Sequence, residues 1–260
     1  MIRFIMDIKQ VFCTCILSLS LLFNAGLGFA QDQGSTVSTQ VINAGIGGNS
    51  SMDLLGRMEV DVLQKNPDMV LLMIGTNDMV NVAKFTSYPD YRAHIESMVG
   101  SLKSKDIEVV LISPIPVDTA YLFERHAREK FDEEPNEKLG KVRMILQDIA
   151  REQGLLFIDL HGAFLDMDIP RHNADELIKN LKNSKEADGV HPTPKGYTFM
   201  GKFIYEKLQK NKTFLNKPKV IVCFGDSITY GSRVSGAGTA EGDTYPAVLQ
   251  RLINQSVQLQ

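Results

Sequence analysis

Residues 220–231 read VIVCFGDSITYG, and this stretch decides the fold. It opens with an apolar run at residues 220–224 and continues into a polar turn bounded by Gly225 and Gly231. A short apolar run without polar alternation is typical of a strand that is buried on both faces of a parallel sheet. Residues 220–224 therefore predict a buried strand, and the polar turn marks its carboxyl end.

Four further short runs have the character of strands, at residues 40–43, 69–74, 109–112 and 155–158. Between the runs, apolar residues recur at the spacing of an amphipathic helix, for example Tyr91, Ile95, Met98, Val99 and Leu102. Strands that alternate with helices predict a doubly wound α/β sheet.

The N-terminus carries a different pattern. Residues 11–23 read VFCTCILSLSLLF and hold no charge, while Arg3 and Lys9 precede them. Small residues follow at Gly28 and Ala30. A basic segment, an apolar segment and then small residues are typical of a secretory signal peptide, here with cleavage after Ala30.

A transmembrane anchor is the alternative interpretation of this segment. Its apolar run is 13 residues long, whereas a spanning helix needs about 20. We therefore expect residues 1–30 to be removed on export and residues 31–260 to form a single domain of a secreted or periplasmic protein. No stable membrane insertion is expected after cleavage.

The composition of the 260 residues is that of an ordinary globular protein, with 43% apolar and 23% charged residues. It excludes a disordered or collagen-like chain, and three cysteines are too few for a disulfide framework. The formal net charge is −3, so the sequence does not indicate a basic surface that would bind nucleic acid. A nucleic-acid partner is therefore not expected.

Three polar motifs directly follow predicted strands, and a fourth lies ahead of the last strand: GDSITYG (225–231), AGIGGN (44–49), GTND (75–78) and DGVHP (188–192). Taken alone, each has a plainer interpretation, as a helix cap, an ordinary turn or part of a metal site. One Asp-x-x-His pair supplies too few ligands for zinc, so no metal or cofactor is expected.

Taken together, the four motifs supply the parts of a hydrolytic site. Ser227 supplies a hydroxyl nucleophile, His191 a base that takes its proton, and Asp188 a carboxylate that holds the other imidazole nitrogen. The backbone N–H groups of Ser227 and Gly48 and the side-chain amide of Asn77 supply three donors for an oxyanion.

The motifs resemble the four blocks of the SGNH, or GDSL-type, hydrolases, with NAGIGGN (43–49) as the glycine block. The resemblance implies a three-layer α/β/α sandwich around a five-stranded parallel, flavodoxin-like sheet. It also implies hydrolysis of O-acyl esters through an acyl-serine at Ser227. Gly48, and not Gly47, matches the family's oxyanion glycine because it directly precedes a polar residue. That residue is Asn49 here and is often Asp in the family, which is a mild departure.

The order of the blocks departs from the family, in which the serine block comes first. Here it comes last, which indicates a circular permutation of the domain. The alternative, a truncated tandem protein, is disfavoured because no second serine block precedes the others. The permutation predicts the strand order 1-5-2-3-4 in chain numbering, with residues 220–224 inside the sheet. It also predicts that the first strand and the last helix lie close together.

The expected secretion favours an esterase that acts on small acyl groups, O-acetyl above all, of carbohydrates. GDSITYGS (225–232) and TYP (244–246) also resemble the corresponding segments of bacterial carbohydrate esterases. A lipid or thioester acyl hydrolase is the alternative, and a non-catalytic carbohydrate-binding scaffold or a flavodoxin-like nucleotide binder is disfavoured. The expected partner is a small-molecule or glycan ester. The acyl group, the alcohol, the regioselectivity and the oligomeric state are left open.

The long polar connections at 117–135 and 162–187 are candidates for shaping the site. Arg233 and the glycine-rich stretch at 235–243 are candidates for a substrate loop, although a flexible loop is the preferred interpretation. Cys223 is interpreted as strand packing, and four histidines are interpreted as surface or structural groups, namely His94, His126, His161 and His172. Binding of an acidic group is one interpretation of Arg125, His126 and Arg128. A solvated helix face is preferred, because acidic residues neighbour them at Glu124, Glu129 and Asp132.

Overall fold

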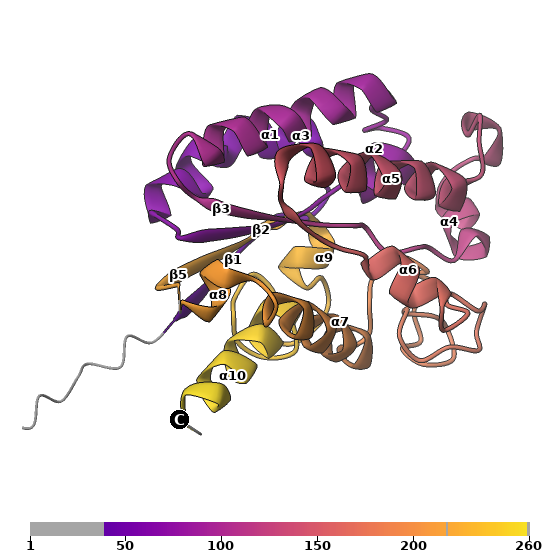
Figure 1. Cartoon of the computed structure of the whole chain (residues 1–260). Coiled ribbons are helices and arrows are strands. Elements are labelled where there is room, and N and C mark those ends of the chain that lie inside the picture. Colours follow the sequence, from indigo (N-terminus) through magenta and orange to yellow (C-terminus); the bar gives the residue numbers. More distant parts are fainter. Residues whose placement is uncertain (1–38, 217, 259–260) are drawn as a thin grey trace, which may run out of the picture. The chain divides into compact units, whose positions relative to one another are not determined.

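Five parallel strands form the central sheet of the computed structural model, which describes residues 39–216 and 218–258 (Figure 1). All of these residues belong to one compact unit. The predicted signal peptide, residues 1–30, lies outside the described residues. The strands are β1 (Gln40–Gly45), β2 (Met69–Met73), β3 (Glu108–Ile112), β4 (Leu156–Ile158) and β5 (Val220–Gly225).

The strands lie in the order β1-β5-β2-β3-β4, and every neighbouring pair is parallel. The predicted order and the predicted α/β fold are therefore confirmed. Strand β5 pairs with β1 on one side and with β2 on the other. The last strand of the chain thus lies inside the sheet, as expected for an apolar run without polar alternation.

Helices cover both faces of the sheet, which gives the three-layer sandwich that the family resemblance implied (Figure 1). One face carries α1 (Ser51–Asp61), α2 (Thr76–Val80), α3 (Tyr88–Lys103), α4 (Thr119–Arg125) and α5 (Pro135–Gln153). The other face carries α6 (Leu160–Leu165), α7 (Pro194–Leu208), α9 (Ser227–Tyr230) and α10 (Tyr245–Gln258). Shorter elements are η1 (Leu63–Lys65), η2 (Arg128–Lys130) and α8 (Lys212–Leu215).

Side chains of β5 alternate between the two layers. Val222 and Phe224 pack with the first set of helices, whereas Ile221 and Cys223 pack with the second. All four are fully buried. Burial raises the pKa of the Cys223 thiol to about 12, so the side chain is neutral and acts in packing.

The first strand and the last helix lie side by side. The N–H of Val41 donates to Oε1 of Gln250 at 2.7 Å, and Nε2 of Gln250 donates to the carbonyl of Thr39 at 2.9 Å. The Gln250 side chain of α10 therefore bonds to the start of β1, and the first strand and the last helix lie close together as predicted. Within residues 39–216 and 218–258, no helix is both long enough and apolar enough to cross a membrane.

Candidate active site

Ser227 is the first residue of α9 and comes two residues after the end of β5. The side chain of Asp226 caps this helix, because its Oδ1 accepts the N–H of Ile228 at 2.8 Å. The strand and the cap together fix the turn at the carboxyl end of the sheet, which is where sites form in open α/β folds.

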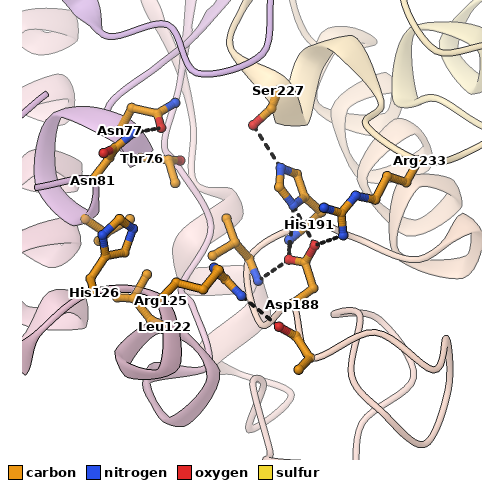
Figure 2. Close-up of a pocket in the computed structure, with 13 residues that line it drawn as sticks. Thr76, Asn77, Asn81, Leu122, Arg125, His126, Asp188, His191, Ser227 and Arg233 are labelled. Atoms are coloured by element: carbon orange, nitrogen blue, oxygen red, sulfur yellow. Dashed lines mark hydrogen bonds and ion pairs between the residues drawn. The ribbon is translucent and has the colours of Figure 1, made fainter. Parts of the chain in front are cut away.

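Ser227, His191 and Asp188 form one chain of hydrogen bonds (Figure 2). Nε2 of His191 lies 3.0 Å from Oγ of Ser227, and Nδ1 lies 2.9 Å from Oδ2 of Asp188. Serine and histidine are 36 positions apart in the sequence. The fold therefore brings together the three residues that the sequence predicts as nucleophile, base and orienting carboxylate.

The environment of Asp188 keeps its carboxyl group ionised. The side chain is 4% exposed, and burial alone raises a carboxyl pKa. Here the effect of burial is smaller than the combined effect of three groups that lower the pKa. They are the side-chain hydrogen bond with His191, the positive charge that His191 can carry, and the backbone N–H groups of Val190 and His191. They hold the pKa of Asp188 well below its usual range. An ionised Asp188 accepts a hydrogen bond from the protonated Nδ1 of His191. Nε2 of His191 then carries no proton and can accept the proton of Ser227.

The glycine motif contacts both the serine and the asparagine motifs. A Cβ at Gly47 would lie 4.0 Å from Cβ of Ser227, and Nδ2 of Asn77 donates to the carbonyl of Asn49 at 3.0 Å. The two neighbours of Gly48 in the sequence thus lie near Ser227 and bond to Asn77, respectively. Its φ of 76° is in the left-handed region, which favours glycine.

All three donors have a hydrogen to offer. The N–H groups of Ser227 and Gly48 donate to no other described residue. The Nδ2 amide of Asn77 carries two hydrogens, of which one goes to the Asn49 carbonyl. The Oδ1 of Asn77 accepts from Nδ2 of Asn81 at 3.3 Å, which fixes the orientation of the Asn77 amide.

Arg57 of α1, which is not among the site residues predicted from the sequence, links the glycine motif to the serine motif. Its guanidinium donates to Oδ1 of Asn49 at 2.7 Å, to the carbonyl of Ala44 at 3.0 Å and to the carbonyl of Gly225 at 2.8 Å. It also stacks over the ring of Phe224 at 4.6 Å. No local pattern marks this arginine, because its partner Gly225 is 168 positions away.

A pocket of about 250 Å³ opens in front of Ser227 (Figure 2). Residues of the two long polar connections line it, as the sequence analysis expected. Arg125 is exposed, as expected of a solvated helix face, and His126 is half-buried, but both side chains also line this pocket. Arg233, which follows the serine motif, also lines the pocket, and its Nη1 lies 3.6 Å from Oδ2 of Asp188.

The other three histidines have structural partners. Nδ1 of His94 lies 2.9 Å from Oγ of Ser51, and Nδ1 of His161 lies 3.2 Å from a backbone carbonyl in the interior. Nδ1 of His172 lies 2.9 Å from Oδ2 of Asp118. None of the three lines the pocket. Among the described residues, no group of three or more His, Cys, Asp or Glu side chains is arranged to bind a metal.

Comparison with known families gives a match to the GDSL-like lipase/acylhydrolase family over residues 23–199. This chain belongs to that family. The matched range contains the glycine, asparagine and Asp/His motifs and ends before Ser227. As a member of this family, the protein is a carboxylic ester hydrolase of the SGNH type, which confirms the enzyme class expected from the motifs.

Among known proteins, the chain is 27% identical over 178 residues to an acetylxylan esterase of Geobacillus stearothermophilus, covering 68% of this chain and 75% of that protein. It is 23% identical over 180 residues to the lipoprotein YqeF of Bacillus subtilis (strain 168), covering 65% and 72%. A solved structure of a catalytic mutant of an acetylxylan esterase from Geobacillus stearothermophilus is similar in fold. Its TM-score is 0.50 at 23% identity, covering 62% of this chain and 68% of that chain.

Proposed function

We propose that this hydrolase removes O-acetyl groups from carbohydrates through an acyl-serine intermediate. The observation that carries the proposal is the hydrogen-bonded chain from Asp188 through His191 to Ser227, which ends in an open pocket. A serine that is hydrogen-bonded to a base, with N–H groups of Ser227, Gly48 and Asn77 free to donate, suits attack on an ester carbonyl.

In this mechanism, Oγ of Ser227 attacks the ester carbonyl carbon while its proton passes to Nε2 of His191. The carbonyl oxygen becomes an oxyanion, which accepts hydrogen bonds from the N–H groups of Ser227 and Gly48 and from Nδ2 of Asn77. The bond to the alcohol oxygen then breaks, and that oxygen takes the proton from His191. Water repeats the sequence on the acyl-serine and regenerates Ser227.

Two observations support an acetylated carbohydrate as the substrate. A relative that shares 27% identity over most of its length is an acetylxylan esterase. The pocket is also lined mainly by polar and charged side chains, and Val80, Leu122 and Val190 are among its few apolar groups. A long acyl chain needs an extended apolar channel, so the lining favours a short acyl group on a polar alcohol.

A hydrolysis screen tests this function, with acetylated sugars and with nitrophenyl esters that range from acetyl to palmitoyl. We expect kcat/KM to be highest for acetyl esters and to fall as the acyl chain lengthens. Ser227→Ala should lower kcat by about 10⁴-fold or more. Undiminished turnover by Ser227→Ala would refute the mechanism, and a preference for palmitoyl esters would select the lipid hydrolase instead.

We also propose that the domain is circularly permuted, with the serine motif relocated to its end. The interior position of β5 supports this, as do the bonds from Gln250 to the start of β1. A relinked chain should test it, with Gln258 joined to Thr39 by a short flexible linker and new ends placed between α8 and β5. It should fold and keep activity within about tenfold, and failure to fold would contradict the proposal.

Export is proposed from residues 1–30, whose sequence has the order of a signal peptide. A mature N-terminus at Gln31 would support cleavage, and retention of residues 1–30 would indicate the membrane-anchor alternative.

A further inference from the structure

Arg125 lines the pocket but has no role in the proposed chemistry. It is the last residue of α4, and its Nη1 donates to the carbonyl of Ala187 at 2.8 Å. This bond ties the guanidinium to the loop that carries Asp188. One donor of the guanidinium is used there, which leaves other N–H groups for a further partner.

The charge of Arg125 is not balanced within the described part of the chain. The other pocket arginine, Arg233, pairs with Glu186 at 2.8 Å and lies 3.6 Å from Asp188. In contrast, no described carboxylate lies within 4.0 Å of Arg125, although Glu124 is its neighbour in the sequence. The pocket therefore holds one arginine that is neutralised by protein carboxylates and one that is not.

His126 adds no second charge to this side of the pocket. Burial and the positive charge of Arg125 lower its pKa, so the imidazole is neutral near pH 7 and can donate or accept one hydrogen bond. A guanidinium beside a neutral imidazole provides both a charge and a neutral hydrogen-bonding group for a ligand.

The position of Arg125 suits the alcohol part of an ester. Figure 2 shows Arg125 and His126 on the side of the pocket opposite Ser227 and Arg233. The pocket of about 250 Å³ exceeds the space that an acetyl group fills, so part of the alcohol occupies it as well. A group bound at Arg125 thus lies away from the ester carbonyl but in the same pocket.

We infer that Arg125 binds a carboxylate on the alcohol part of the substrate, so that the favoured substrates are acetylated sugars that contain a uronic acid. This inference rests on the proposed function. A planar guanidinium matches the geometry of a carboxylate and forms charge-assisted hydrogen bonds with it. A purely structural role for Arg125, as a cation at the C-terminus of α4, is independent of the charge of the substrate.

The test compares two substrates that differ only at carbon 6, an acetylated methyl glucuronoside and the matching acetylated methyl glucoside. The quantity measured is the ratio of their kcat/KM values near pH 7. In the wild type we expect the glucuronoside to be favoured about tenfold or more at low salt. The ratio should fall as salt is added, because the charge of Arg125 is exposed to solvent.

Arg125→Gln keeps a side-chain donor for the Ala187 carbonyl and removes the charge, so the ratio should fall by about tenfold. Arg125→Lys keeps the charge and should retain part of the preference. Arg128→Gln is the matched control, since Arg128 is an exposed arginine close by in η2 that does not line the pocket. Its ratio should equal that of the wild type.

A wild-type ratio near one, or a ratio that Arg125→Gln leaves unchanged, would overturn the inference while the glucoside is still hydrolysed. Loss of hydrolysis of both substrates in the wild type would instead overturn the proposed function. If Arg125→Gln does not fold, the wild-type ratio and its salt dependence still decide the question.

Discussion

Asp188 and Asp226 are both buried next to the Ser227–His191 pair, yet their surroundings drive their pKa values in opposite directions. Asp188 accepts hydrogen bonds from the imidazole and from two backbone N–H groups, and its pKa is held well below the usual range. Asp226 is 1% exposed. Burial raises its pKa to about 6, against the hydrogen bond from Ile228, and the nearby Asp78 adds to the rise.

The difference shows that the role of a buried carboxyl group depends on its hydrogen-bond partners and not on its residue type. Asp188 is ionised across the neutral range and can stabilise a positively charged imidazole. Asp226 has no cation in hydrogen-bond contact within the part of the chain that the structure describes, and it caps α9 through Oδ1. One aspartate therefore suits electrostatic support of His191, whereas the other suits the shape of the turn that carries Ser227.

The largest expected difference between the two carboxyl groups is in turnover. Asp188→Asn keeps the size of the side chain and an oxygen acceptor but removes the charge that holds the imidazole in its productive tautomer. We expect kcat for an acetyl ester to fall by about 10⁴-fold. Steady-state kinetics measures the loss, and thermal unfolding checks that the variant is folded.

Asp226→Asn is the matched control for that substitution. Its amide oxygen can still accept the N–H of Ile228, so kcat should stay within about tenfold of the wild type. Equal losses in the two variants would remove the contrast between the two carboxyl groups.

An oxyanion donor that touches neither carboxyl group gives an intermediate effect. Asn77→Ala removes one donor and should lower kcat by about 10²- to 10³-fold with a smaller change in KM. Asn81→Ala, one helical turn later, removes one of the two bonds that orient the Asn77 amide, together with the bond from the N–H of Ala83, but leaves the Asn77 donor in place. It should cost less, and a larger loss in Asn81→Ala than in Asn77→Ala would contradict the assignment of Asn77 as the donor.

The fold was predictable from the sequence because each strand is a short apolar run bounded by a polar turn. The interior position of β5 follows from residues 220–224, which alternate between two helical layers and so have no polar face. The strand order needed the resemblance to a family with known connectivity, since apolar runs alone do not specify which strands pair.

The site was predictable to the extent that its residues lie in motifs at strand ends. The structure brings Ser227, His191, Asp188 and Asn77 to that edge of the sheet, and their catalytic roles stay predictions. Arg57 was not predictable, because its partners come from distant parts of the chain. Arg125 was predicted to lie on a solvated helix face because acidic residues neighbour it in sequence. It is exposed, and the fold also places it in the lining of the pocket, which the local sequence does not indicate.

The smallest effect concerns stability. In the unfolded chain the carboxyl group of Asp226 loses its proton near pH 4, whereas in the folded protein it keeps the proton until about pH 6. The unfolded state thus binds fewer protons between these values, so the contribution of Asp226 to the free energy of unfolding decreases as the pH rises from about 4 to about 6. The pKa of Asp188 is shifted the other way, and its contribution decreases only as the pH falls below about 4.

Asp226→Asn isolates this contribution, because Asp78, whose pKa is also raised, is present in both proteins. A pKa difference of about two units corresponds to about 3 kcal/mol. The difference in free energy of unfolding between Asp226→Asn and the wild type should therefore increase in favour of the variant by up to about 3 kcal/mol as the pH rises from 4 to 7. Urea unfolding at these two pH values measures the difference. If the difference between variant and wild type is the same at both pH values, the pKa of Asp226 is not raised in the folded protein. Asp188 and Asp226 would then differ in their hydrogen-bond partners but not in the direction of their pKa shifts.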